Sequence, residues 1–202
     1  MAGTGSCECL LLGPEGVGKT LLLKKLQALN KKPTKGSSKA SSGGKRGDSS
    51  CSLTDGVLPT IPTVGTNVEE LVLGKRLVCV LREYGGSMAP VWGSAYAHCQ
   101  MVVYVIDTSN LTQISAATVL LVEVMSADAL KDKPLLLFFN KTDSHFGMSL
   151  VELKSIMRID EMVKSASQTV TVVHGSCVTD KGVEEILQWI SENTKQLQRQ
   201  KH

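Results

Sequence analysis

The sequence of 202 residues has few aromatic residues, no long apolar run and no paired cysteines. Aromatic side chains make up 4% of it, too few for a surface that stacks on exposed bases, so we expect no specific nucleic-acid partner. No apolar run approaches the roughly 20 residues that a membrane-spanning helix requires. The six cysteines lack C-x-x-C spacing and partnering histidines, which argues against a zinc site or a disulfide framework and favours reduced thiols in the cytosol or nucleus.

The formal net charge of +3 is unevenly distributed. Between Lys31 and Asp48 lie six cations and one anion, so this segment carries +5 and the rest of the chain carries −2. Residues from about 30 to 57 are rich in Lys, Ser and Gly, which predicts a disordered basic insert within a single domain of residues 1–202. This insert is either a solvated tether or a tract that contacts acidic lipid or RNA, and both readings stay open.

A phosphate-binding motif stands near the beginning of the chain. Residues 13–20 have the spacing G-x-x-x-x-G-K-[ST] of a P-loop, between a strand-like run (7–12) and a helix-like run (21–29). In such a loop, successive backbone N–H groups point at phosphate oxygens, the lysine reaches the β- and γ-phosphates, and the threonine hydroxyl can ligate Mg²⁺. The candidate phosphate-binding residues are Gly13, Glu15, Gly16, Val17, Gly18, Lys19 and Thr20. The alternative is a glycine-rich turn that only begins a helix.

Apolar patterning elsewhere predicts the fold class. Strand-like runs alternate with helix-like runs, which is typical of an α/β fold with a mostly parallel sheet. The expected strands are residues 7–12, 67–73, 76–82, 101–106, 135–139 and 169–173, and the expected helices are residues 21–29, 112–130, 150–166 and 183–198. The second and third strands follow each other closely around Gly74, which predicts a hairpin and an antiparallel edge.

A second motif, residues 140–143, follows the buried strand at 135–139 directly. Asp143 can accept hydrogen bonds from both N1–H and the 2-amino group of guanine, whereas adenine lacks these donors. Asn140 can tie this loop to the P-loop, and the stem of Lys141 can lie over the base. The two motifs together predict binding of a guanine nucleotide and disfavour a P-loop kinase or ATPase.

With the run P-T-V-G-T-N at residues 62–67, the chain resembles small GTPases of the Arf-like branch. The resemblance implies a P-loop G domain with a mostly parallel six-stranded sheet, one antiparallel edge strand and helices on both faces. It also implies GTP or GDP with Mg²⁺ as cofactors, and two switch segments that grip the γ-phosphate of GTP and relax on GDP.

The resemblance assigns further residues to the site. Thr63 would ligate Mg²⁺ and reach the γ-phosphate, to which Gly86 would present its amide. Glu83, where the family usually has aspartate, would meet Mg²⁺ through water. The last base-contacting loop would be formed by Ser176, Cys177 and Val178.

Catalysis is where the sequence departs most from the family pattern. Ser87 stands in place of the glutamine that orients the attacking water, and a serine side chain is too short for that role. We therefore assign no residue firmly to catalysis and expect hydrolysis that is slow, absent or dependent on a partner. The alternative is a constitutively GTP-bound scaffold or interaction module without turnover.

The expected partners are effector proteins, which would bind through residues 62–73 and 82–96, with an exchange factor and a GTPase-activating protein. The aromatic positions of Arf effector contacts correspond to Thr66, Arg82 and Ala95, so Arf effectors are not transferable. Ala2 replaces the glycine that N-myristoylation needs, and no prenylatable cysteine ends the sequence. We expect a cytoplasmic monomer without a stable membrane anchor.

Three further residues carry weaker expectations. Asp107 ends a strand and is expected to cap a turn or helix rather than act as a base. Trp92 is expected to pack, although its place after the second switch segment leaves partner contact open. His174 precedes the base-contacting loop, where its titration would have a small effect on binding.

Overall fold

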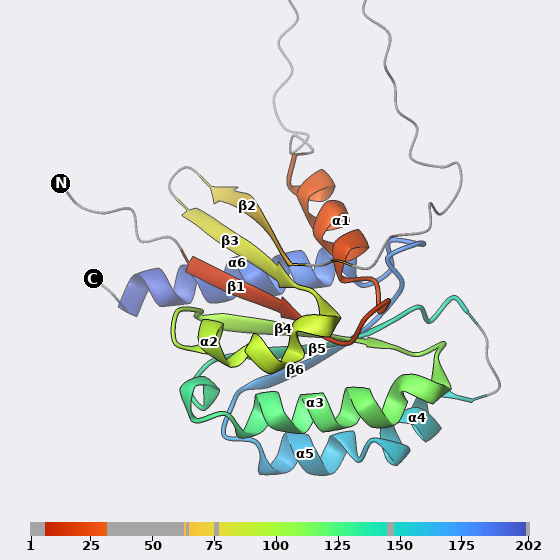
Figure 1. Ribbon diagram of the computed structural model, residues 1–202. Helices are drawn as coiled ribbons and strands as arrows, with labels where there is room; N and C mark the ends of the chain where they lie inside the picture. Colours follow the sequence, from red (N-terminus) through yellow and green to blue (C-terminus); the bar gives the residue numbers. More distant parts are fainter. Residues whose placement is uncertain (1–6, 32–62, 64, 75–76, 145–147, 201–202) are drawn as a thin grey trace, which may run out of the picture.

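The computed structural model describes residues 7–31, 63, 65–74, 77–144 and 148–200. Their centre is a six-stranded sheet in the order β2-β3-β1-β4-β5-β6 (Figure 1). The strands are β1 (Cys7–Leu12), β2 (Thr66–Gly74), β3 (Leu77–Tyr84), β4 (Met101–Asp107), β5 (Leu135–Asn140) and β6 (Val170–His174).

The strand pairing confirms the predicted α/β sheet. β2 and β3 are antiparallel, with Glu69 opposite Leu81, and the other four pairs are parallel. β2 therefore forms the antiparallel edge that the sequence predicts. β1, β4 and β5 lie in the middle, and their nearly continuous apolar runs suit strands that are covered on both faces.

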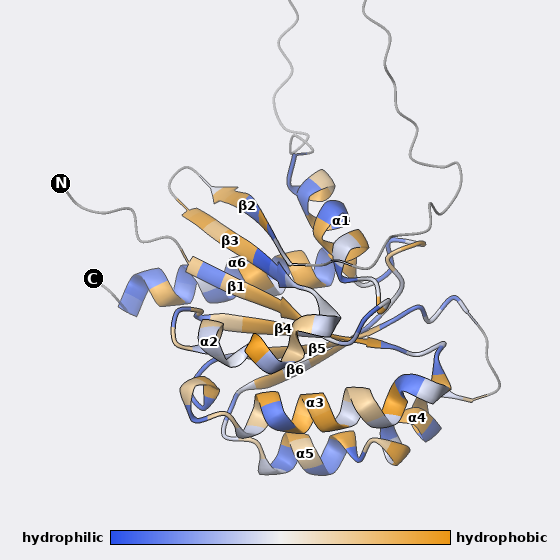
Figure 2. Cartoon of the chain, in the orientation of Figure 1, coloured by the Kyte–Doolittle hydropathy of each residue, from blue (hydrophilic) through white to orange (hydrophobic). Residues whose placement is uncertain are grey.

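Helices cover both faces of the sheet (Figure 1). They are α1 (Lys19–Lys31), α2 (Gly93–Tyr96), α3 (Ile114–Ser126), α4 (Leu150–Ile156), α5 (Ile159–Ser165) and α6 (Val183–Gln200). Because side chains alternate along a strand, Leu11 packs with α1 and α6 whereas Leu10 packs with the opposite layer, which includes α3. In Figure 2 the central strands are mainly hydrophobic, while α6 alternates hydrophobic and hydrophilic residues.

One predicted helix is divided in two. The pattern at residues 150–166 predicts a continuous helix, but α4 ends at Ile156 and α5 begins at Ile159. Met157 and Ile159 are both buried, and two residues apart on one helix they would point to nearly opposite sides. Arg158 between them adopts a left-handed conformation (φ 52°), which turns the chain so that both side chains reach the core.

Two other helices differ from the prediction at their ends. The helix predicted at residues 112–130 is α-helical only in α3, with a 3₁₀ turn before it (Leu111–Gln113) and another after it (Asp128–Leu130). α1 continues through Asn30 and Lys31, where the composition predicts the beginning of the insert. When the N and O atoms of the Asn30 side-chain amide are assigned by their hydrogen-bond partners, Asn30 donates to the carbonyl of Val72 and accepts from the N–H of Val72, both at 3.0 Å.

The rest of the predicted insert, residues 32–57, lies outside the described residues, as does Lys75 of the turn predicted at Gly74 and Lys75. The helices in the described part of the chain are all too short or too polar to cross a membrane.

Candidate functional site

The loops that carry the predicted motifs meet at the carboxyl ends of the parallel strands. The P-loop follows β1, Asp107 ends β4, residues 140–143 begin at the last residue of β5, and residues 175–178 follow β6. Open α/β sheets bind their ligands at this edge. Segments that are far apart in the sequence are therefore assembled into one site.

Side chains from outside the P-loop hold three of its successive carbonyl groups. Those of Glu15, Gly16 and Val17 accept hydrogen bonds from the side chains of Gln113 (3.0 Å), Lys141 (2.8 Å) and Asn140 (2.8 Å). In a trans peptide the N–H points opposite to the C=O. The following N–H groups therefore face the other side of the loop, as a phosphate cradle requires.

Lys19, in the first turn of α1, is 5% exposed. Its ammonium donates to the carbonyls of Gly13 (2.8 Å) and Pro14 (2.7 Å). Burial lowers the pKa of Lys19 to about 8, although Glu83 and Glu15 act in the opposite direction. An anion beside this ammonium would favour its charged form.

Three predicted metal ligands lie together. Thr20 Oγ1 donates to Glu83 Oε1 at 2.6 Å and lies 3.0 Å from Thr63 Oγ1, which is 3.3 Å from Glu83 Oε1. Asn67 Nδ2 donates to the other oxygen of Glu83 at 2.8 Å. Two hydroxyls and a carboxylate are the hard oxygen donors that suit Mg²⁺, so the residues present fit this ion. The described residues contain no cluster of three His, Cys, Asp or Glu side chains that could hold a metal.

Gly86 lies against the P-loop backbone. A Cβ atom on Gly86 would come within 2.2 Å of the Glu15 N atom and 2.5 Å of the Pro14 carbonyl carbon. The segment after β3 can approach the P-loop this closely only because residue 86 has no side chain. The neighbouring Ser87 is exposed.

Asn140 joins the P-loop to the loop after β6. Its Nδ2 donates to the Val17 carbonyl, and its Oδ1 accepts from Cys177 N–H at 3.0 Å. The tie to the P-loop that the sequence predicts is thereby confirmed. Ser176 is fully buried, and its hydroxyl accepts from the backbone N–H groups of Val178 and Thr179, which shapes this loop.

Asp143 and Val178 are exposed at the same edge. Thr142 connects their two loops, since both its N–H and its hydroxyl donate to the Gly175 carbonyl. The structure thus brings residues 140–143 beside residues 175–178, where the resemblance places the base. Contact of these residues with guanine stays a prediction.

Asp107 and Gln113 are site residues that the sequence analysis did not identify. Asp107 Oδ1 accepts from the N–H and hydroxyl of Ser109, as a turn cap does, but its Oδ2 also lies 2.6 Å from Lys141 Nζ. Only its position could have indicated that Asp107 belongs to the site, because it ends β4 and lies beside Asn140 of β5. No comparable sequence signal marks Gln113, which lies in a 3₁₀ turn.

Trp92 is a core residue. It is 1% exposed, and its indole N–H donates to the Gly85 carbonyl at 3.3 Å. The packing role predicted for Trp92 is confirmed. Ala95, one of the positions that correspond to Arf effector contacts, is buried as well.

His174 stacks on Phe139 with ring centroids 5.5 Å apart. Burial lowers the pKa of His174 below its ordinary value, and the positive charges of Lys154 and Lys181 lower it further. The imidazole is therefore mostly neutral at pH 7.

Comparison with known proteins agrees with this architecture. The sequence profile of the ADP-ribosylation factor family matches residues 52–194. The human ADP-ribosylation factor-like protein 16 is 37% identical over 90% of this chain and 83% of its own length. ADP-ribosylation factor-like protein 1 of Saccharomyces cerevisiae is 28% identical over 94% of this chain and 88% of its own length.

Among solved structures, the small GTPase Arl6 (BBS3) of Trypanosoma brucei, with the nucleotide analogue GppNp bound, superposes with a TM-score of 0.70. The alignment covers 95% of this chain and 99% of that one at 17% identity, a level that supports the fold alone. From the profile and the human relative, the chain belongs to the ADP-ribosylation factor family, as an Arf-like small GTPase.

Proposed function

We propose that the protein is a Mg²⁺-dependent GTP/GDP switch whose own hydrolysis of GTP is slow. The observation that carries the proposal is the double contact of Asn140, which joins the P-loop carbonyl of Val17 to the N–H of Cys177. This contact holds the P-loop and residues 175–178 at a fixed separation, as a nucleotide that spans both loops requires. Family membership makes guanine the base.

The proposed binding roles follow the predicted residues. P-loop N–H groups and Lys19 would hold the phosphates, Thr20 and Thr63 would ligate Mg²⁺ with Glu83 beside them, and Asp143 would select guanine. Mg²⁺ would neutralise charge on the β- and γ-phosphates. Gly86 lies close enough to the P-loop for its amide to meet a γ-phosphate, which supports a role in sensing GTP.

Slow hydrolysis is proposed because Ser87 stands where the family usually has the glutamine that orients the attacking water. Its side chain is short and exposed, and orientation of the attacking water is a large part of what a GTPase contributes. A partner that inserts a polar group beside the γ-phosphate would then accelerate the reaction. A single-domain organisation and a cytoplasmic location belong to the same proposal; the location is suggested by six cysteines without C-x-x-C spacing or partnering histidines.

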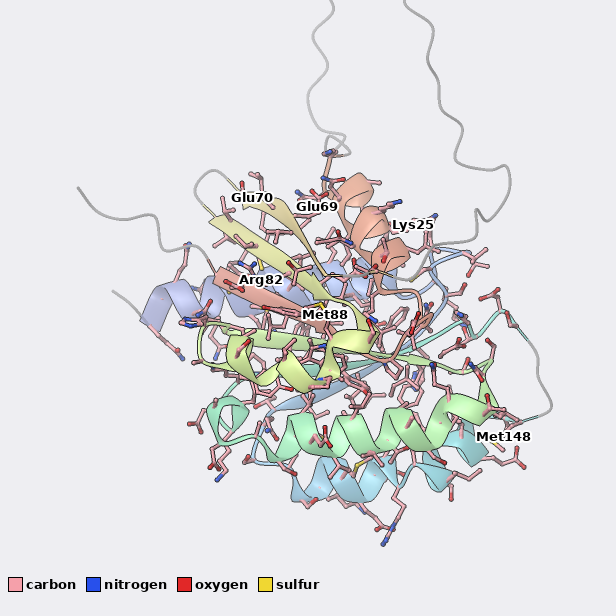
Figure 3. The ribbon with its side chains drawn as sticks, in the orientation of Figure 1. Lys25, Glu69, Glu70, Arg82, Met88 and Met148 are labelled. Carbon is pink, nitrogen blue, oxygen red and sulfur yellow. The ribbon has the colours of Figure 1, made fainter. Side chains whose placement is uncertain are left out.

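The uncovered face of β2 and β3 is the proposed effector surface. Val68 and Val72 of β2 are 47% and 58% exposed, and Val68 is opposite Arg82 of β3. Figure 3 shows Glu70 and Arg82 on these strands. Arg82 forms a 2.7 Å ion pair with Glu8, where Arf proteins place an aromatic residue, so we expect effectors different from those of Arf proteins.

The alternative function is a scaffold that stays bound to GTP. It is favoured by the same exposed Ser87, since a site that cannot orient water would keep its nucleotide intact.

Single-turnover hydrolysis decides between the two. Purified protein would be loaded with GTP, and the bound nucleotide would be identified by chromatography before and after incubation with Mg²⁺. Conversion to GDP over minutes to hours supports the slow switch. Persistent GTP, also in the presence of cell extract as a source of activating protein, supports the scaffold. Absence of any bound guanine nucleotide overturns both.

A further inference from the structure

Asp107 is a buried carboxylate that forms an ion pair with Lys141. It is 5% exposed at the end of β4, and its Oδ2 lies 2.6 Å from the Lys141 ammonium. The same ammonium donates to the Gly16 carbonyl at 2.8 Å. Asp107, Lys141 and the P-loop therefore form a continuous chain of contacts, whose first member lies outside the recognised motifs.

Lys141 needs such support because its backbone is strained. Its φ of 65° is left-handed, a conformation that is unfavourable for a residue with a side chain and persists only where the surroundings impose it. The ion pair with Asp107 supplies this constraint from one side. On the other side, Thr108 N–H and hydroxyl both donate to the Asn140 carbonyl, immediately before Lys141.

Gln113 contacts the P-loop independently. Its side-chain amide donates to the Glu15 carbonyl at 3.0 Å from a turn that is 98 residues away in sequence. Glu15 is also the residue against which Gly86 packs. Gln113 therefore supports the P-loop at the point where the segment after β3 touches it.

We propose that Asp107, through Lys141, and Gln113, directly, are positioning residues that hold the P-loop in its nucleotide-binding shape. Their bonds turn the carbonyls of Gly16 and Glu15 outward, which keeps the following N–H groups directed into the cradle. Preorganised donors bind an anion without the cost of reordering the loop. The inference rests on the proposed binding of guanine nucleotide and adds that these two residues set how long the nucleotide stays bound.

The test is the dissociation rate of a fluorescent GDP analogue from the full-length protein in the presence of Mg²⁺. Asp107→Asn keeps the side-chain shape and the contacts with Ser109 but removes the charge, and we expect dissociation about tenfold faster. Gln113→Glu keeps the shape and replaces the donor with an acceptor that faces the Glu15 carbonyl. We expect it to release GDP several-fold faster, and Gln113→Arg, which restores a donor, to return the rate toward wild type.

Matched controls remove comparable groups elsewhere. Asp128→Asn removes the charge from an exposed ion pair with Lys131, and Gln188→Glu alters an exposed side chain on α6. Both should leave GDP dissociation unchanged. Circular dichroism and elution volume would verify that each variant is folded.

A double variant separates positioning from general stabilisation. If Asp107 acts through Lys141, then Asp107→Asn should add nothing to the faster release caused by Lys141→Met. If the increases in dissociation rate of the two single variants multiply in the double variant, Asp107 does not act through Lys141. Dissociation within twofold of wild type for both Asp107→Asn and Gln113→Glu would overturn the inference while leaving nucleotide binding intact. Failure of the wild type to bind GDP would instead overturn the proposed function itself.

Discussion

The hydroxyl of Thr20 donates a 2.6 Å hydrogen bond to Glu83, across 63 residues of sequence. The carboxylate thus lies beside both threonines that we expect to ligate Mg²⁺, and Asn67 holds its other oxygen. Glu83 is one methylene longer than the aspartate that the resemblance leads us to expect, and its carboxylate contacts Thr20, Thr63 and Asn67.

Glu83→Gln tests this arrangement. The variant keeps the length of the side chain but removes the negative charge beside the metal position, so we expect Mg²⁺ to be held about tenfold more weakly. The measurement is the Mg²⁺ concentration at which GDP release is half suppressed. Glu123→Gln, on the exposed side of α3, is the control and should not change it. An unchanged midpoint in Glu83→Gln would contradict a role of Glu83 near the metal.

The lowered pKa of Lys19 predicts a dependence of nucleotide affinity on pH. Burial brings the pKa to about 8, so the free protein loses this cation as the pH rises through 8, while bound phosphate keeps it protonated. Binding then takes up a proton, so affinity should fall as the pH rises through about 8 and should approach a loss of about tenfold per pH unit above that value. Titration of GDP binding from pH 6.5 to 9 measures this.

Lys19→Arg is the control for this titration, because a guanidinium stays charged throughout the range. Its affinity is expected to be lower overall, since the fork does not fit between the Gly13 and Pro14 carbonyls as an ammonium does, but independent of pH. An equal pH dependence in both proteins would assign the titration to another group.

Asp143→Asn should relax the preference for guanine. The amide can accept one hydrogen bond but presents an N–H₂ to the second guanine donor, so we expect GTP affinity to fall by roughly a hundredfold. Xanthosine triphosphate, which has a hydrogen-bond acceptor in place of the second guanine donor, should bind the variant better than it binds the wild type. Competition among GTP, ATP and xanthosine triphosphate measures both effects, and an unchanged GTP-to-ATP ratio would refute the assignment of Asp143.

Gly86→Ala is expected to weaken the binding of GTP more than that of GDP. The added Cβ would stand 2.2 Å from Glu15 N, so the segment after β3 must move away from the P-loop. The amide of residue 86 would then no longer reach the γ-phosphate. The loss of this charge-assisted hydrogen bond should lower the affinity for GTP by about tenfold. Gly93→Ala is the matched control, because its Cβ would meet nothing within 4 Å. Equal losses for GTP and GDP would contradict a role of Gly86 in sensing the γ-phosphate.

Trp92 should matter for stability rather than for partner binding. Trp92→Ala would remove one of the largest fully buried side chains and is expected to lower the free energy of unfolding by about 3–5 kcal/mol. Trp92→Phe would retain most of the burial and lose only the bond to the Gly85 carbonyl, at a cost of about 1–2 kcal/mol. Urea denaturation in saturating GDP measures both. A loss below 1 kcal/mol for the alanine variant would show that Trp92 is not the core residue described here.

Local features of the sequence determined most of the fold and the two binding motifs. The apolar runs of β1, β4 and β5 could be read directly because strands covered on both faces need such runs. The P-loop and residues 140–143 were equally accessible, since their chemistry depends on residue types at fixed short spacing. The resemblance based on them pointed to the family that the profile confirms.

Only the tertiary structure decided what depends on contacts between distant segments. The break at Arg158 could not be read from a helical pattern, because it follows from the need of Met157 and Ile159 to reach the same core. The pairing of Asp107 with Lys141 and the reach of Gln113 to Glu15 arise from strand order and loop placement. Sequence spacing encodes periodicity and local motifs, whereas the partner of a polar side chain is chosen by which distant segment folds beside it.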